Sequence, residues 1–227
     1  MAHKVDPKTF RTRGLSDWKT RAFYENPAQS LEEDFVIRKF LNKKLERFGL
    51  EKIELERSAD KLNIIITSSR PGLIIGRGGE GVETLKKELD KELAKISKHP
   101  WNKEAERKEK AGGKKEIKIE IQEIKNPWVS ASLTAQWAAS QLEKRVAYRR
   151  VLKQGLSKMM ANKEIKGARI ELAGRLNGSE IARREWVASG SLPLQTLRAN
   201  VDYAKHVAKC SYGVIGIKVW MYKGEEF

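Results

Sequence analysis

At 227 residues, 40% of them hydrophobic, the chain is long enough for two modest domains, and no apolar run approaches the roughly 18 residues of a membrane-spanning helix. Its single cysteine and three histidines exclude an intrachain disulfide and a zinc cluster built from Cys and His ligands. The net charge of +16 and the pI near 9.8 indicate a polyanionic partner such as a nucleic acid.

Residues 1–29 show no sustained periodicity and are interpreted as an irregular, basic N-terminal arm that also carries aromatic side chains. Such an arm can become ordered on RNA through phosphate contacts and base stacking, which makes Lys4, Arg11 and Arg13 candidate RNA ligands. A frayed terminus without a binding role is the alternative.

The next segments predict a helix followed by a hairpin. A capping box that begins at Ser30, an apolar face and a closing glycine predict a helix over residues 31–48. Alternating and isoleucine-rich segments predict strands at 52–57 and 62–67, joined as a hairpin. After a short apolar helix, a glycine loop and a long amphipathic helix, a third strand is predicted at 117–121.

The glycine loop lies in the run PGLIIGRGGEGV, residues 71–82, which opens directly onto the long helix. Free N–H groups at a helix N-terminus, and glycines that lack Cβ, allow a sugar–phosphate backbone to approach closely. Gly76, Gly78 and Gly81 also fit the dinucleotide fingerprint GxGxxG, but Pro71 separates them from the preceding strand, and the GK[ST] ending of a Walker loop is missing. A plain glycine turn between two helices is a further alternative.

The favoured interpretation of this run is I-G-x-x-G-x-x-V, the signature of a KH domain, whose GXXG loop clamps about four single-stranded nucleotides by their backbone. The RNA-binding loop would then be Gly76, Arg77, Gly78 and Gly79. The order helix, strand, strand, helix, loop, helix, strand resembles the type II KH arrangement, with a three-stranded mixed sheet packed by helices. The charged stretch 97–116, interrupted by proline and glycines, is interpreted as an exposed excursion.

Asn126 and Pro127 mark a domain boundary, and residues 127–227 beyond it carry 17 basic and 8 acidic side chains. Apolar residues at helical spacing predict two helices between Ser130 and Met159. Four strands are predicted after them, at 168–172, 181–187, 197–203 and 214–222. The second domain is therefore predicted to be α+β, with two helices on a four-stranded antiparallel sheet.

A basic ladder is predicted on the second of these helices. Arg145, Arg149 and Lys153 are spaced four residues apart, with Arg150 beside them, and no acidic residue accompanies them. Cations on one helical flank can follow the phosphates of a nucleic acid strand. A merely solvated helix face is the alternative.

A catalytic function has little support in the sequence. His206 and Cys210 lie four residues apart, but no third partner or loop accompanies them, so packing or surface exposure is the favoured interpretation. The sequence therefore predicts no enzyme, no catalytic residue, no metal, no cofactor and no small-molecule substrate.

Several stretches resemble the bacterial-type ribosomal protein S three family over nearly the full length of the chain. They are HKVDP, RPGLIIGRGGEGVETL, SQLEKRVAYRRVLK, GARIELAGRLNGSEIARREWVASGSLPLQTLRANVDY and SYGVIGIKVWMYKGE. The last two are long and specific, since KH domains occur in many RNA-binding proteins but this tail points to one family. The resemblance implies an arm at 1–29, a type II KH domain at 30–126 and a C-terminal ribosomal domain at 127–227.

The resemblance also implies a structural constituent of the small-subunit head. The uninterrupted length and the lack of a transit-like N-terminus favour the bacterial cytoplasm over an organelle. The implied partners are small-subunit rRNA, mRNA and neighbouring head proteins of the S ten and S fourteen families. In the family, a basic helix matching Arg149, Arg150 and Lys153 lines the mRNA entry tunnel and assists unwinding of mRNA structure. The candidate rRNA ligands are Lys4, Arg11, Arg13, Arg145, Arg175, Arg183, Arg184 and Arg198.

Two positions and one segment depart from the family pattern. Asp6 stands where His is usual, Gly78 stands where a second basic residue is common, and the 97–116 excursion is longer than expected. A free-standing KH regulator of particular transcripts is the alternative function, and a nuclease acting on damaged DNA is a third class.

Overall fold

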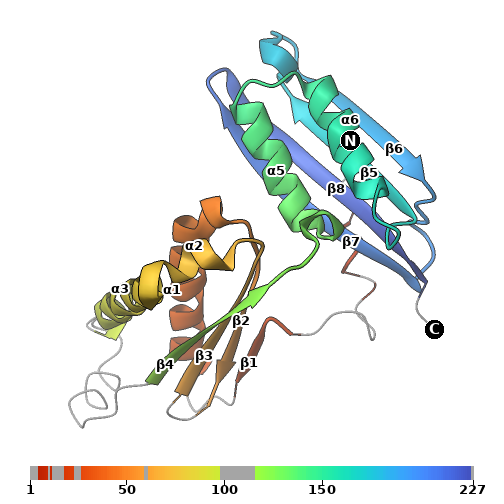
Figure 1. The fold of residues 1–227 in the computed structure, drawn as a ribbon. Helices are drawn as coiled ribbons and strands as arrows, with labels where there is room; N and C mark the ends of the chain where they lie inside the picture. The colour runs from red at the N-terminus through yellow and green to blue at the C-terminus, as the bar shows by residue number, and fades with distance from the viewer. Residues whose placement is uncertain are drawn as a thin grey trace. The chain divides into compact units, whose positions relative to one another are not determined.

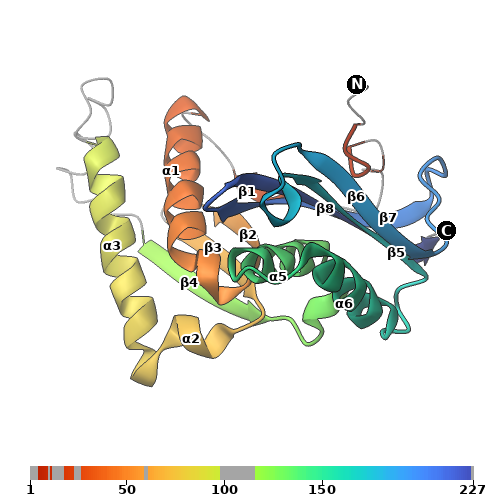
Figure 2. The ribbon, with the colours of Figure 1, turned by 90° about the horizontal axis from the view of Figure 1, so that it is seen from above.

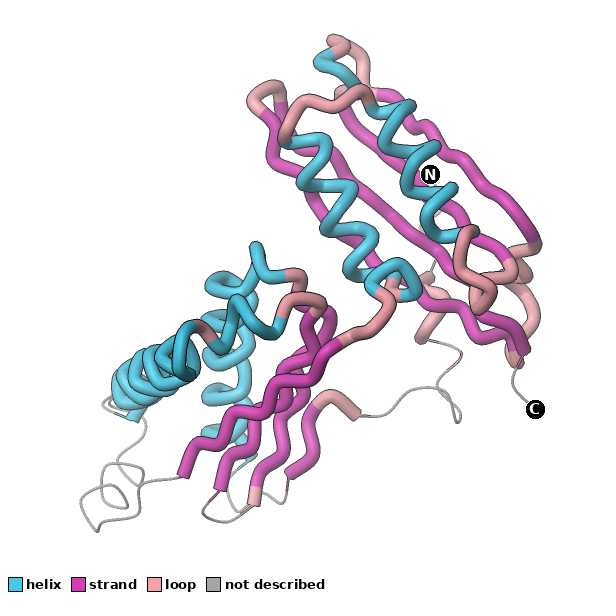
Figure 3. Tube along the Cα trace, in the orientation of Figure 1, coloured by secondary structure: helices cyan, strands magenta, loops and turns pink. Residues whose placement is uncertain are grey.

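The computed structural model describes residues 5–9, 11, 18–22, 27–58, 61–97 and 116–225. The chain divides into two compact units, the N-terminal unit (residues 18–125) and the C-terminal unit (residues 1–17 together with 126–227). Each unit is a sheet with helices packed on one face (Figures 1 and 3). In the described ranges, no helix is long and apolar enough to cross a membrane.

The N-terminal unit contains a mixed four-stranded sheet in the order β1-β2-β3-β4. Its elements are β1 (Thr20–Ala22), α1 (Pro27–Leu45), β2 (Leu50–Arg57), β3 (Lys61–Ser68), α2 (Pro71–Ile75), α3 (Glu80–Ser97) and β4 (Glu116–Glu123), with 3₁₀ turns at Glu46–Phe48 and Arg77–Gly79. β2 and β3 are antiparallel, whereas β1 and β4 run parallel to β2 and β3 respectively. The predicted hairpin, glycine loop, long helix and third strand are all confirmed.

The core of this unit lies between the sheet and the two long helices. Ile37, Leu41 and Leu45 of α1 are fully buried, at the spacing that predicted its inner face. They pack in one cluster with buried residues of the strands and of α3, among them Leu55, Ile64, Ile66, Leu85 and Leu89. Because alternate strand residues point to opposite faces, the other face of the sheet carries the polar side chains.

Strand β1 was missed by the sequence analysis, which predicted three strands and an irregular arm. It pairs with β2 through Thr20 to Ala22, and the Leu55 N–H donates to the Lys19 carbonyl at 3.0 Å. The Arg38 guanidinium donates to the carbonyls of Lys19 and Ile53 and to Thr20 Oγ1, at 2.6 to 3.0 Å. A three-residue strand is too short to show alternation, so these tertiary contacts specify it.

Helix α1 also begins earlier than predicted. The capping box placed its start after Ser30, whereas the helix starts at Pro27 and includes Ser30. Proline has the backbone φ of a first helical turn and no N–H to leave unpaired there, which accounts for the earlier start. The end agrees with the prediction, since Gly49 closes the following 3₁₀ turn in a left-handed conformation, with φ of 69°.

The C-terminal unit has two helices on one face of an antiparallel sheet in the order β6-β5-β8-β7 (Figure 2). Its elements are α5 (Ala131–Glu143), α6 (Tyr148–Met160), β5 (Gly167–Gly174), β6 (Arg183–Gly190), β7 (Ala199–Cys210) and β8 (Gly213–Glu225), with 3₁₀ turns at Pro127–Val129 and Leu176–Gly178. The two predicted helices and four predicted strands are confirmed. The helices bury alanines, Val151 and Met159 against alternate residues of β5 and β8, such as Ile170 and Ile217.

Helix α5 receives its N-terminal cap from a distant strand. Asp202 of β7 accepts the backbone N–H of Ala131 at 2.9 Å, and the Lys8 ammonium lies 2.6 Å from the same carboxylate. Burial opposes ionisation of Asp202, but Lys8 and the Ala131 N–H outweigh it, so that the pKa of the carboxyl lies below its usual value. Residues 5–9 of the predicted arm are thereby tied to the C-terminal unit.

Candidate nucleic-acid interface

The GXXG loop joins α2 to α3 through three glycines with positive φ. Gly76, Gly78 and Gly79 have φ of 72°, 61° and 86°, a region that favours glycine. A Cβ added at Gly76 would lie 3.1 Å from the backbone N of Gly81, whereas Gly78 and Gly79 have open space around them. At Gly78 and Gly79 glycine is therefore required by backbone conformation, and the surrounding space is accessible to a ligand backbone.

Gly81 has a role that the sequence analysis did not assign. A Cβ at this position would lie 2.4 Å from the Ile74 carbonyl oxygen and 2.8 Å from that of Ile75. The first turn of α3 thus packs directly on the end of α2. In the sequence Gly81 was noted only as part of a rejected dinucleotide fingerprint.

The surroundings of the loop are mixed in character. Arg77 is exposed at the tip, but Glu80 and Glu83 occupy the first turn of α3. Two apolar side chains of α2 are also exposed, Leu73 at 58% and Ile75 at 39%. The loop therefore offers backbone and apolar contacts more than a concentration of positive charge.

Helix α6 presents the predicted basic flank. Arg149, Arg150 and Lys153 are all exposed, and none forms an ion pair with a described residue. On the inner side, a Cβ added at Gly155 would lie 2.7 Å from the Ile170 side chain, so the helix lies directly against the sheet. Close packing on one side and three cations on the other define an outward-facing surface, the α6 flank (Arg149, Arg150 and Lys153).

Arg145 does not extend this flank as the four-residue spacing predicted. It lies in the turn between α5 and α6 with φ of 62°, and its N–H donates to the Leu142 carbonyl. Because α6 begins only at Tyr148, the helical ladder from Arg145 to Arg149 is not formed. A positive φ at arginine has no signal in helical periodicity, which is why the prediction was wrong here.

The start of α6 lies beside a shallow pocket that joins two predicted arginines. The Tyr148 N–H donates to the Asn177 side-chain oxygen at 3.4 Å, which supplies a cap that Ala147 cannot. The pocket, of about 340 Å³, is lined by Arg149 and Arg183 together with Ala147, Tyr148, Leu176, Asn177 and Ser179. The structure thus brings together two basic residues that the sequence analysis assigned to different sites.

The remaining predicted arginines are partly engaged within the protein. Arg175 donates to the carbonyls of Ser179 and Tyr212, at 2.9 and 3.1 Å, and so braces two turns. Arg184 pairs with the buried Glu171 at 2.6 Å, and Arg198 pairs with Glu225 at 2.8 Å. Since Arg184 and Arg198 remain more than half exposed, they can still present charge to a ligand.

Arg11 has a structural placement that differs from the prediction. It is 5% exposed, and its guanidinium donates to the carbonyls of Pro7, Pro193, Leu194 and Thr196. Burial lowers the pKa of this group from its usual value. Arg11 therefore fastens the N-terminal segment to the loop before β7. Lys4, Arg13 and most of the 97–116 excursion lie outside the described residues.

Helix α6 carries a further cation, Lys158, on a different side from the α6 flank. The Lys158 ammonium lies 4.7 Å from the Trp128 ring and 5.0 Å from the Trp137 ring, and the two rings meet edge to face. Because five residues turn a helix by about 140°, Lys158 does not share the side of α6 that carries Lys153. Lys158 adds a fourth basic side chain to the exposed surface of α6.

The two residues of the catalytic alternative do not form a site. His206 and Cys210 lie on one strand, four residues apart, which separates them by about 13 Å. The Cys210 side chain packs against the core and approaches the Leu142 carbonyl at 3.8 Å. Across the ranges that the structure covers, no group of three or more His, Cys, Asp or Glu side chains could hold a metal.

Two family models match the chain, one for each unit. Residues 36–129 match the KH domain, and residues 138–221 match the C-terminal domain of ribosomal protein S3. The chain is 40% identical to small ribosomal subunit protein uS3 of Synechococcus sp. (strain JA-2-3B'a(2-13)), over 99% of this chain and 86% of that protein. It is 42% identical to uS3c of Guillardia theta, over 100% and 97%, and 41% identical to uS3 of Desulforamulus reducens, over 99% and 93%.

Proposed function

Because the chain belongs to the uS3 family of small ribosomal subunit proteins, we propose that its C-terminal unit binds small-subunit rRNA and that its α6 flank grips mRNA as it enters the subunit. The protein is a structural, non-enzymatic component of the small ribosomal subunit. Its cytoplasmic location and its contacts with head proteins of the S ten and S fourteen families remain predictions.

The observation that carries the mRNA proposal is the α6 flank itself. Arg149 and Lys153 lie one helical turn apart, with Arg150 beside them, and all three are exposed without an ion-pair partner among the described residues. Phosphate contacts of this kind position a strand without reading its sequence. A protein that every mRNA must pass needs such sequence-independent contacts, and holding one strand apart from its complement would favour the opening of a hairpin.

The GXXG loop is a second proposed RNA contact. Its left-handed glycines leave the backbone open, Arg77 offers one charge, and the exposed Leu73 and Ile75 lie beside it. This combination suits a short single-stranded segment held by its backbone. We propose rRNA contacts for Arg145, Arg175, Arg183, Arg184 and Arg198 of the C-terminal unit, and for Lys4 and Arg13.

The mRNA proposal is tested by measuring how fast ribosomes translate through a stable mRNA hairpin. We expect the triple variant Arg149→Ala, Arg150→Ala, Lys153→Ala to assemble into small subunits but to slow translation through a stable mRNA hairpin, while an unstructured mRNA is translated at the normal rate. The matched control replaces three exposed lysines of α3, Lys86, Lys87 and Lys91, by alanine. Equal progress of both variants through the hairpin would contradict the role of the flank.

A further inference from the structure

The face of the C-terminal sheet that the helices leave uncovered carries aromatic and basic side chains in a regular arrangement. The strand registers place Arg169 opposite Trp220, and Trp220 opposite Tyr203, in one row across the sheet. The next row runs from Trp186 through Glu171 and Lys218 to Lys205. We call the side chains of these rows, together with Arg184 and Val207 in the row beyond, the open face.

The open face contains a continuous run of cations and aromatic rings in contact with one another. The Arg169 guanidinium carbon lies 4.4 Å from the Trp186 ring centre and 5.3 Å from that of Trp220. Trp220 lies 5.2 Å from Tyr203, whose ring has the Lys205 ammonium at 5.6 Å. These contacts fix the rings in place, so a ligand that stacks on them meets a preorganised surface.

Part of this surface is accessible and part is covered by the chain itself. Trp186 is 54% exposed and Val207 48% exposed. Toward the other end of the sheet, Val201 and Tyr222 are buried, and Leu192 packs against them. Leu192 directly precedes Pro193 and Leu194, whose carbonyls accept hydrogen bonds from Arg11. The accessible part therefore centres on Trp186 and the lysines and extends about 14 Å across four strands.

The charges of the open face are not balanced within the protein. Among its described residues, four are cationic (Arg169, Arg184, Lys205 and Lys218) and one, Glu171, is anionic. Both arginines pair with Glu171, at 3.1 and 2.6 Å. Lys218 lies opposite Glu171 and attracts it without an ion-pair contact, whereas Lys205 forms no ion pair with a described carboxylate. Lys205 and Lys218 lie directly opposite each other, a like-charge pairing that destabilises a sheet unless an anion lies between them.

From this arrangement we infer that the open face is a binding site for unpaired nucleotides of small-subunit rRNA, with a base stacked on Trp186 and phosphate on Lys205 and Lys218. The inference rests on the proposed rRNA binding and gives it a location. An exposed ring beside cations is the combination that binds single-stranded nucleic acid. A protein partner fits less well, because the cores of protein interfaces are depleted in lysine.

The test measures the affinity of the full chain for protein-free small-subunit rRNA by filter binding, at fixed magnesium and salt. We expect Trp186→Ala to weaken binding about tenfold, since stacking on an aromatic side chain contributes about 1 to 3 kcal/mol per base. Trp186→Phe should keep most of the affinity. The double variant Lys205→Gln, Lys218→Gln should weaken binding and reduce the slope of log K against log salt by about 1.4.

The matched control is Lys52→Gln, Lys118→Gln, on the uncovered face of the N-terminal sheet, and it should bind as the unmodified chain does. Unfolding midpoints close to that of the unmodified chain show that the open-face variants are folded.

If the unmodified chain binds rRNA and the open-face variants bind equally well, the inference is wrong and the proposed function stands. If the variants bind bare rRNA normally but are lost from assembled subunits, a protein covers the face and the inference is again wrong. If the unmodified chain does not prefer small-subunit rRNA to a competitor RNA, the proposed function itself fails.

Discussion

Both units expose one face of a sheet, and the two faces differ in how many carboxylates accompany their basic side chains. In the N-terminal unit, four cations lie beside four carboxylates, in the pairs Lys52–Glu54, Lys118–Glu120, Arg21–Glu56 and Lys61–Glu116, at 2.6 to 3.7 Å. In the C-terminal unit, the open face has four cations and one carboxylate. A basic side chain therefore indicates a polyanion site only where its neighbours leave its charge unpaired.

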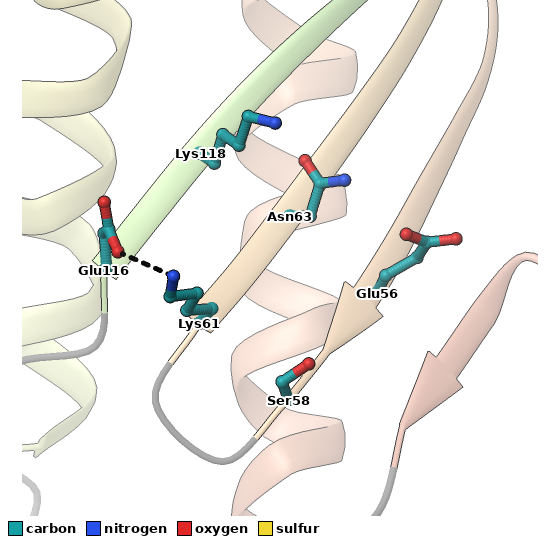
Figure 4. Close-up of a pocket in the computed structure, with 6 residues that line it drawn as sticks. All are labelled: Glu56, Ser58, Lys61, Asn63, Glu116 and Lys118. Atoms are coloured by element: carbon teal, nitrogen blue, oxygen red, sulfur yellow. Dashed lines mark ion pairs between the residues drawn. The ribbon is translucent and has the colours of Figure 1, made fainter.

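The pocket on the N-terminal sheet illustrates the point. It has a volume of about 270 Å³ and is lined by Glu56, Ser58, Lys61, Asn63, Glu116 and Lys118 (Figure 4). Two lysines and two glutamates lie around it, and the Lys61–Glu116 pair at 3.7 Å is drawn across its edge. Because its two glutamates balance its two lysines, this pocket has no net attraction for phosphate, although it contains as many lysines as the open face.

The strongest test of the comparison removes one carboxylate from each face. Glu171 is 1% exposed and holds two arginines, so Glu171→Ala should lower the free energy of unfolding of the C-terminal unit by about 2 kcal/mol. Glu120→Ala removes a carboxylate from an exposed pair and should cost far less. Urea denaturation followed by tryptophan fluorescence measures the difference, and equal losses would show that the two faces are built alike.

A second test uses salt to count the phosphate contacts of the α6 flank. Each cation that neutralises a single-strand phosphate contributes about 0.7 to the slope of log K against log salt. The triple alanine variant of Arg149, Arg150 and Lys153 should therefore flatten the slope for an unstructured RNA by about 2. The variant Lys52→Gln, Lys118→Gln should leave it unchanged, and an unchanged slope for the triple variant would remove the α6 flank from the RNA interface.

A third and smaller effect is expected in acid. Burial opposes ionisation of Glu171, but Arg184 and Arg169 outweigh it and lower the pKa of this carboxyl below its usual value of 4.5. Because the folded-state pKa lies below the unfolded one, the stabilisation is complete above about pH 4.5 and is lost as the pH falls through the folded value. Unfolding measured from pH 6 to 3 should show a shallower acid limb for Glu171→Gln, and identical limbs would contradict the role of the carboxylate.

The long periodic elements could be predicted from the sequence because their signals are local. Helix α3 shows its apolar stripe, β8 shows a dense β-branched run, and the GXXG loop shows its glycines. The features that were missed depend on contacts between distant residues. Strand β1 depends on Arg38, and the burial of Arg11 depends on carbonyls more than 180 residues away.

The residues of the proposed binding sites divide in the same way. The position of Arg149, Arg150 and Lys153 on one side of α6 could be predicted because helical spacing places them there. Arg145 could not be placed, because a turn with positive φ interrupts the spacing. Period-two alternation indicates that Arg169 and Glu171 share a face of β5, but only the register shows that Trp186, Lys218 and Lys205 lie beside them.

The most direct test of the proposed function maps contacts in the assembled small subunit. An mRNA that carries 4-thiouridine downstream of the decoded codon is cross-linked by near-ultraviolet light, and the modified peptides are identified by mass spectrometry. We predict that the cross-links in this protein concentrate on α6, between residues 148 and 160, and are lost in the triple alanine variant. Cross-links confined to the N-terminal unit, or none to this protein, would contradict the assignment of α6 to the mRNA path.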